Sequence, residues 1–320
     1  MYEIYAALKR GCTFLSYAIT VGTQVFIMFL LMVVGYVVYK GHLFDDEGAR
    51  QISVFLLKIV TPVTIVVSYQ REFDSNLAGM LAISFPLAVL CHLLPIGAGH
   101  LLYRSHVADY RDKRMSLVFS NNGFMALPLL QTLLGSVGVF LGSAHIVVAT
   151  ILIWTYGQYT LTGDKRSISL KMIFLNPGTL AVIVGVVLFV SPVKLPLPVF
   201  ETLKYISALN TPLAMILCGI FVAQANILSV FKDRSVYAMA LLKLVVVPIA
   251  VLLLLRFIPV ATEIRVALMI AVSCPSATSV VMFANNYKTN YIYCAKVVSA
   301  TTLLSVLTLP FILALTQIAW

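Results

Sequence analysis

Long runs without a charged residue dominate the chain. Lys, Arg, Asp and Glu are absent from residues 11–39, 75–103, 115–163, 172–193, 205–231, 266–287 and 297–320. A helix needs about 20 mostly apolar residues to cross about 30 Å of hydrocarbon, so the 49-residue run 115–163 holds two spans. Two further apolar stretches, 51–70 and 235–255, are each interrupted by one lysine, Lys58 and Lys243. The pattern therefore predicts ten membrane spans.

Composition agrees with this pattern. Charged residues make up 11% of the 320 residues, against about a quarter in soluble proteins, and the mean hydropathy is +0.99. The runs are continuously apolar and do not alternate as the strands of a membrane barrel do. We expect an all-α polytopic membrane protein. The five cysteines are scattered and suggest no disulfide or metal site, and no cofactor is expected.

Basic residues predict the orientation. Most of them fall in loops after odd-numbered spans, namely Lys40, Arg50, Arg104, Arg111, Lys113, Arg114, Lys165, Arg166, Lys171, Lys232, Arg234 and Lys288. The opposite loops hold Arg71, Lys194, Lys204, Arg256 and Arg265. By the positive-inside rule both termini lie outside the cytoplasm, although Lys9 and Arg10 favour the reverse weakly. The basic excess is thus explained without nucleic acid.

An internal repeat indicates a transporter. A shift of 150 residues places Gly35 on Gly185 and the Thr61-Pro62 pair on Thr211-Pro212. Each repeat holds five spans, and two halves with an odd number of spans lie in the membrane with opposite orientation. This is the inverted-repeat plan of many secondary transporters.

The fourth span of each half carries a polar interruption. Residues 120–123 read Ser-Asn-Asn-Gly ahead of Pro128, and residues 273–279 read Ser-Cys-Pro-Ser-Ala-Thr-Ser. Proline removes a backbone donor, and Asn and Ser compete for backbone groups, so both helices should break near the bilayer midplane. The half-helix N-termini at such breaks suit a carboxylate. The alternative is that each proline only kinks a packed helix.

Four segments resemble the auxin efflux carrier family, which includes plant PIN carriers and bacterial organic-acid permeases. They are SNNGFMALPLL at 120–130, FLNPGTLAVIVGVVLF at 174–189, NTPLAMILCGIFVA at 210–223 and CPSATSVVMFANNY at 274–287. The resemblance implies two inverted five-helix repeats, 1–163 and 164–320. Scaffold helices would occupy about 17–70 and 172–226, and transport-domain helices about 75–163 and 235–320.

The same resemblance implies an elevator-type carrier of organic anions, such as dicarboxylates or auxin-like acids, whose substrate binds where the broken fourth and ninth helices cross. Carried onto this chain, the substrate-binding residues are Asn121, Asn122, Gly123, Pro128, Pro275, Ser276, Ala277, Thr278 and Ser279, with Lys58 as a further candidate. The connection between the halves, LTGDKRSISLK, has about ten residues, which is typical of short bacterial members and implies a bacterial inner membrane. A homodimer through the scaffold helices is also implied.

Isolated ionisable residues within spans have competing interpretations. Lys58 either supplies a counter-charge for an anion or snorkels to the interface, and for Lys243 snorkelling is the simpler interpretation. His145 is expected near the outer end of the fifth span, where a histidine is more often interfacial than a proton carrier. His92 and His100 are too far apart to share ligands. The predicted spans contain no carboxylate, so a proton or sodium site built on a buried acid is not supported.

Other functions fit less well. A sodium-coupled symporter of the bile-acid type shares the ten-helix plan, but the sodium ligands are scarce. A channel would ordinarily show a pore ring or a repeated filter. An intramembrane enzyme would need paired aspartates, a Ser/His pair or a His-Glu-x-x-His motif, and the sequence has none, so we expect no catalytic residues.

Overall fold

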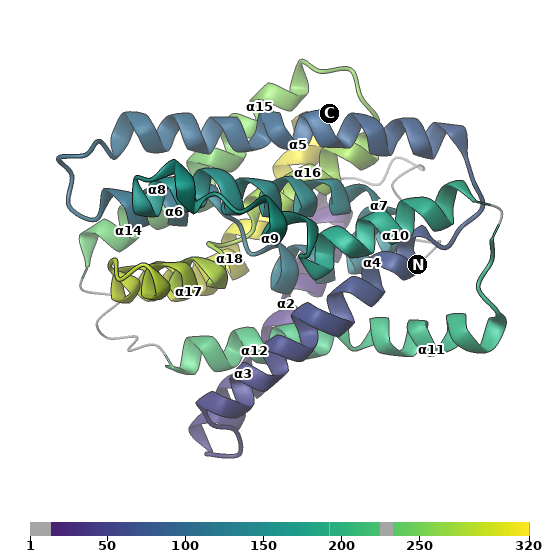
Figure 1. Cartoon of the computed structure of the whole chain (residues 1–320), viewed down its shortest axis with the longest axis horizontal. Helices are drawn as coiled ribbons and strands as arrows, with labels where there is room; N and C mark the ends of the chain where they lie inside the picture. The colour runs from purple at the N-terminus through teal and green to yellow at the C-terminus, as the bar shows by residue number, and fades with distance from the viewer. Residues whose placement is uncertain (1–13, 192, 225–232, 320) are drawn as a thin grey trace.

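A computed structural model of the chain describes residues 14–191, 193–224 and 233–319 (Figure 1). The orientation signals at Lys9, Arg10 and Lys232 lie outside these residues. Within them every regular element is a helix, as expected for the all-α class.

The elements follow one another in this order: α2 (Phe14–Lys40), α3 (Asp46–Phe55), η1 (Leu56–Val60), α4 (Thr61–Tyr69), α5 (Ser75–Leu102), α6 (Tyr110–Val118), η2 (Asn122–Ala126), α7 (Leu127–Leu152), η3 (Ile153–Gly157), α8 (Gln158–Thr162), η4 (Lys165–Ser167), α9 (Leu170–Phe174), α10 (Pro177–Val190), α11 (Leu197–Ala208), α12 (Asn210–Gln224), α14 (Arg234–Leu241), η5 (Leu242–Val246), α15 (Val247–Arg256), α16 (Thr262–Ser273), α17 (Thr278–Asn286) and α18 (Tyr291–Ala319). Of the short η elements, η4 is a 3₁₀ turn and the other four are π turns. In Figure 1, α5 runs along one edge of the molecule and the end-to-end helices α11 and α12 along the other.

Seven helical segments in the described residues are long and apolar enough to cross a membrane. The count is eight if α9 and α10, which meet at a 45° bend, form one span. The separate helices α6, α16 and α17 have 9, 12 and 9 residues and are too short to cross alone. The structure thus shows a multi-pass helical protein, and the ten-span count stays a prediction.

Prolines explain three of the π turns. Pro62, Pro128 and Pro248 each lie two residues after a π turn, which is η1, η2 or η5. A proline has no N–H, and its ring presses on the carbonyl four residues back. The residue before each proline donates instead to the carbonyl five residues back. Such a bulge changes the direction of the side chains on that turn.

Helices α2 and α12 touch backbone to backbone at two glycines. A Cβ atom on Gly35 would stand 2.0 Å from the carbonyl oxygen of Ile216, and one on Gly219 would stand 1.9 Å from that of Met32. Small residues permit this close approach, which increases dispersion contact between membrane helices. Only glycine fits at either position.

Helices α4 and α10 pack in a corresponding way. The ring of Tyr69 lies against Gly185, where a Cβ atom would stand 2.7 Å from the ring. The shift of 150 residues places Gly35 on Gly185 and Tyr69 on Gly219. The first Thr-Pro pair also contacts the start of α12, because the Thr61 hydroxyl donates to the side-chain oxygen of Asn210 over 3.5 Å.

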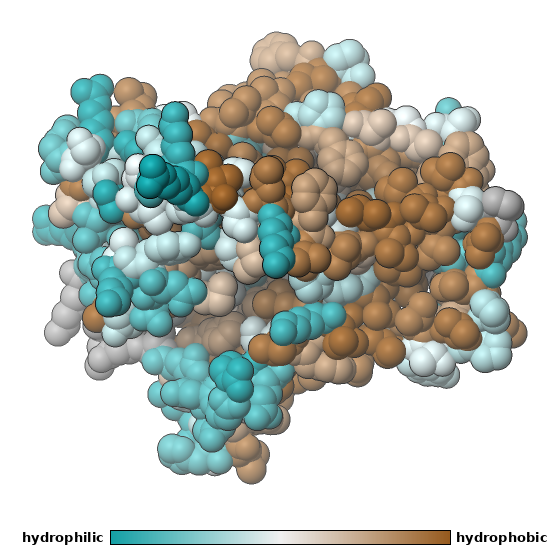
Figure 2. Space-filling model, viewed as in Figure 1, coloured by the Kyte–Doolittle hydropathy of each residue, from teal (hydrophilic) through white to brown (hydrophobic). Residues whose placement is uncertain are grey.

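The remaining helices pack around the interruptions at 119–122 and 274–277. Helix α7 lies against α5 and α16, and α18 lies against α2, α14, α16 and α17. Within α7 the chain kinks at Gly135, whose φ of 64° favours glycine. Figure 2 shows a broad hydrophobic surface over the centre and right of this face, while hydrophilic side chains gather at the left end and around α3 at the bottom.

Candidate functional site

The first polar interruption ends α6 inside the protein. Helix α6 stops at Val118, Phe119 is extended, and the helical path resumes with η2 at Asn122. The carbonyl oxygen of Asn121 accepts from both Met125 and Ala126, so Asn121 stands where an N-cap would. Pro128 follows in α7, two residues after the π turn η2, as described above for the three prolines.

The second interruption separates α16 from α17. The residue before a proline is biased to extended conformations, and Cys274, just before Pro275, has ψ 150°. Helix α17 then begins at Thr278 without a side-chain cap on its first N–H groups. The sequence prediction that both helices are interrupted at these residues agrees with the structure.

The interruptions are bonded to each other, and we call them the paired breaks (residues 119–122 and 274–277). The N–H of Asn121 donates to the carbonyl of Pro275 over 2.8 Å, and the N–H of Ala277 donates to that of Phe119 over 2.9 Å. These bonds make an antiparallel bridge centred on Ser120 and Ser276.

Each central serine caps the helix that ends at the opposite break. The Ser276 hydroxyl donates to the carbonyl of Ser116 in α6 over 2.7 Å, and the Ser120 hydroxyl donates to that of Val272 in α16 over 3.4 Å. The last carbonyls of a helix have no partner within it, so the two hydroxyls satisfy acceptors that would otherwise be unpaired. In addition, the N–H of Ser276 donates to the hydroxyl of Thr301 in α18.

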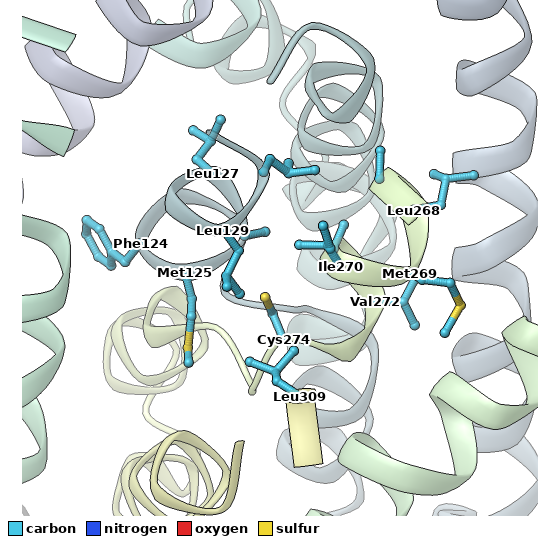
Figure 3. Packing of buried hydrophobic residues seen from close by; sticks show 14 of the residues in the cluster. Phe124, Met125, Leu127, Leu129, Leu268, Met269, Ile270, Val272, Cys274 and Leu309 are labelled. Atoms are coloured by element: carbon cyan, nitrogen blue, oxygen red, sulfur yellow. The ribbon is translucent and has the colours of Figure 1, made fainter. Parts of the chain in front are cut away.

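Hydrophobic packing holds the paired breaks in position. In Figure 3, Leu129 of α7 and Ile270 of α16 point toward one another, and Cys274 lies close to Leu309 of α18. All four residues are buried members of one hydrophobic cluster. The breaks are therefore fixed by the surrounding helices and not only by their own hydrogen bonds.

Lys243 brings a positive charge to the paired breaks. Its side chain is 1% exposed, and the ammonium donates to the Ser120 hydroxyl over 2.8 Å and to the Leu117 carbonyl over 3.0 Å. The second bond places the charge at the C-terminus of α6, the negative end of that helix dipole. In the part of the chain that the structure describes, no carboxylate pairs with Lys243. The expected snorkelling of Lys243 is therefore wrong.

The other face of the paired breaks meets α12. The Asn121 amide nitrogen approaches the Cys218 sulfur at 4.0 Å, and the side-chain oxygen of Asn122 is buried without a partner in the described residues. An unsatisfied amide oxygen in a buried position costs about 1–3 kcal/mol, and only a group that donates a hydrogen bond can recover it. Asn121 thus presents its amide N–H groups toward the boundary with α12.

A small cavity lies at this boundary. It has a volume of about 10 Å³, room for about one water molecule, and is lined by Cys218, Phe221, Val222, Thr278, Val298, Ser299 and Thr302. The cavity lies between α12 on one side and α17 and α18 on the other. An organic anion does not fit unless these helices move apart.

The structure brings together nearly all the residues expected at the site. Asn121, Asn122, Pro128, Pro275, Ser276 and Ala277 are buried, and Gly123, Thr278 and Ser279 are partly buried at the first turns of η2 and α17. Lys58 is the exception, because it is exposed on η1 and has no hydrogen bond or ion pair to the paired breaks in the described residues. Its contact with substrate stays a prediction.

Two histidines lie in the interior near Lys243. His92 of α5 and His145 of α7 are 3% and 1% exposed, and their ring centroids are 4.4 Å apart. The sequence placed His145 near the outer end of a span, where an interfacial position is usual, and the structure corrects this. The pair was missed because its members lie on different spans.

One carboxylate is also buried at the start of α6. The sequence placed Asp112 in a loop, but α6 begins at Tyr110, so Asp112 is within the broken helix and 3% exposed. Its carboxylate accepts from the Thr289 hydroxyl over 2.6 Å and from the Asn290 N–H over 3.2 Å. These bonds tie α6 to the turn between α17 and α18. A surface hollow of about 510 Å³ beside this turn has no lining residue from the paired breaks.

Two comparisons relate the chain to known proteins. The family model described as Membrane transport protein matches residues 20–172 and 164–313. The uncharacterized transporter MJ1031 of Methanocaldococcus jannaschii is 23% identical over 210 residues, which cover 61% of this chain and 67% of that protein. Both are transporters, in agreement with the expectation from the four motif segments. The chain belongs to the membrane transport protein family, the group of auxin efflux carriers and their relatives.

Proposed function

We propose that the protein is a secondary transporter of organic anions, such as dicarboxylates or auxin-like acids, whose carboxylate binds at the paired breaks. Asn121, Asn122, the Thr278 hydroxyl and the first N–H groups of α17 contact the substrate on the side that faces α12, where Thr278 lines the small cavity. Lys243 provides the balancing positive charge from the opposite side.

The buried ammonium of Lys243 carries this proposal. An isolated charge in a membrane interior is expensive, and such residues mark substrate or ion pathways. Lys243 is held by two neutral oxygens, one of which belongs to Ser120 of the paired breaks. An anion bound across the bridge from Lys243 supplies the counter-charge that the surrounding helices do not.

The closed boundary beside α12 supports an elevator-type mechanism. The cavity of about 10 Å³ between α12 and helices α17 and α18 is too small for an organic acid. Binding and release then require the helices that carry the paired breaks to move against α12 and α2. The corresponding contacts of Gly35 and Gly185 support two inverted five-helix repeats, with α2, α4, α10 and α12 in the scaffold.

A sodium-coupled symporter fits the geometry less well. The C-terminus of α6 attracts cations, but the Lys243 ammonium already occupies it. A sodium ion there would meet a fixed positive charge. The anion carrier therefore accounts for more of the observed contacts.

Uptake by proteoliposomes tests the proposal. The purified full chain is reconstituted, and initial rates are measured with radiolabelled succinate, malate and indole-3-acetate against protein-free vesicles. We expect at least one probe to enter faster with protein. Asn121→Ala and Thr278→Ala should each lower kcat/KM for that probe about tenfold or more, because a hydrogen bond to a charged group contributes about 1.5–3 kcal/mol.

Thr202→Ala is the matched control. Thr202 lies exposed on α11, and its hydroxyl bonds only within that helix. The control should transport at the wild-type rate. If Asn121→Ala and Thr278→Ala also match the wild type in rate and affinity, the substrate does not bind at the paired breaks.

A further inference from the structure

His92 and His145 form a second ionisable centre near Lys243. His92 and His145 lie with their rings 4.4 Å apart and tilted by 32°, and both are enclosed by protein. Neither contacts the small cavity beside α12. Their position on α5 and α7 places them among the helices that the proposed mechanism moves as one body.

The hydrogen bonds show where a proton can bind. The Nδ1 atom of His92 lies 2.8 Å from the carbonyl oxygen of Ala88, which can only accept, so the Nδ1 atom carries a hydrogen. In the neutral ring the Nε2 atom of His92 then has a free lone pair. The Nδ1 atom of His145 is buried and has no partner in the described residues. The pair therefore offers basic nitrogens that the fold does not use.

Few other charged or titratable groups face the pair. Lys243 on η5 is close enough to interact electrostatically with both rings. Cys274, which follows α16, interacts electrostatically with Lys243. On α4, the Tyr69 hydroxyl forms a hydrogen bond with Ser143, which lies two residues before His145. On α6, the carboxylate of Asp112 accepts hydrogen bonds from Thr289 and Asn290.

We propose that the His92–His145 pair binds the proton that is coupled to anion transport, so that the protein is a proton–anion symporter. This inference rests on the proposed function, because it assigns the driving ion to the same anion carrier. One proton adds to a free ring nitrogen on one side of the membrane and leaves from it on the other. No covalent bond to the substrate forms or breaks.

Charge balance explains the coupling. With Lys243 charged and the substrate site empty, a proton on either histidine would place a second positive charge in the same interior. A bound anion cancels the Lys243 charge and removes this repulsion. Anion binding therefore favours proton binding, and by linkage the proton favours the anion to the same extent. The loaded and empty forms then carry similar net charge when the anion is monovalent.

Gradient-driven uptake of succinate tests this inference. Proteoliposomes with the full chain are prepared with an interior one pH unit more alkaline than the medium, and accumulation of radiolabelled succinate is compared with that in vesicles without a gradient. Coupling to one proton raises the accumulation ratio by up to about tenfold. Proton entry that accompanies succinate is followed with a pH-sensitive dye trapped inside, and protein-free vesicles give the passive background.

Histidine variants locate the proton. In His92→Gln and His145→Gln the gradient-dependent increase should disappear, while exchange of internal for external succinate continues without its pH dependence. His100→Gln is the matched control, since His100 lies on the same helix and makes the same Nδ1 contact to a carbonyl four residues back, but is exposed. It should keep the tenfold response. Size-exclusion profiles identify any variant that fails to fold.

The outcomes separate the two proposals. Succinate exchange without any gradient effect or proton entry in the wild type overturns the coupling and leaves the anion carrier intact. A full gradient response in both folded histidine variants overturns the assignment to this pair. If succinate, malate and indole-3-acetate show neither uptake nor exchange, the proposed function fails and the coupling fails with it.

Discussion

Lys243→Met should lower transport about a hundredfold without destabilising the protein. The variant removes the charge at the paired breaks but keeps a long, flexible side chain of similar volume. An anion within about 6 Å of the ammonium gains about 3 kcal/mol at an effective dielectric constant of about 20, so kcat/KM should fall about a hundredfold.

Lys243→Met lowers transport, but it should not lower the stability of the protein. A buried charge without an ionic partner pays a desolvation cost that often exceeds its hydrogen bonds, and apolar replacements of buried charges are often neutral or stabilising. We therefore expect the melting temperature of Lys243→Met in detergent to equal or exceed that of the wild type.

Lys204→Met serves as the control for this experiment. Lys204 is exposed on α11 and pairs with Glu201, so the same substitution there removes one charge far from the paired breaks. It should change the initial rate by less than about twofold, as is usual for exposed ion pairs. Wild-type transport by Lys243→Met would show that the substrate does not depend on this charge, and the anion proposal would lose its main support.

The helix interruptions were predictable because their cause is local. Proline and consecutive polar residues within an apolar run oppose a continuous helix whatever lies around them. The contact between Ser120 and Ser276 does not have a local cause. It joins residues far apart in sequence, and only the repeat and the family resemblance suggested it.

The two intramembrane lysines show what sequence cannot supply. Lys58 and Lys243 both lie in a π turn shortly before a proline, yet Lys58 is exposed and Lys243 is buried. Distance along the helix gives depth in the membrane but not the direction of the side chain. That direction depends on the bulge and on which helices pack beside it, so the sequence did not show that Lys243 is the buried one.

The sequence showed neither the division of the charge-free runs into short helices nor the histidine pair, for related reasons. Charge-free runs measure how much apolar chain is available, but a run such as 266–287 is divided in the structure into α16 and α17, which are short helices. His92 was compared with His100 because both lie on one helix. Its actual neighbour, His145, comes from another helix, and helix packing alone decides that contact.

Gly35→Ala and Gly219→Ala should destabilise the fold strongly. Each added Cβ atom would stand about 2 Å from a carbonyl oxygen of the facing helix, so α2 and α12 must separate along their whole contact. Overpacking of this kind costs about 3 kcal/mol or more when backbone must shift. Unfolding of the purified variants in mixtures of detergent and dodecyl sulfate, followed by circular dichroism, should show this loss.

Gly22→Ala gives the opposite result on the same helix. A Cβ atom at Gly22 meets nothing within 4 Å, so the substitution adds no clash. Alanine favours a helix over glycine by up to about 1 kcal/mol, and the variant should be as stable as the wild type or slightly more stable. Equal stability of all three variants would contradict backbone contact between α2 and α12. A loss of stability in Gly35→Ala and Gly219→Ala, but not in Gly22→Ala, would instead show that this contact stabilises the packing of the two proposed halves of the scaffold.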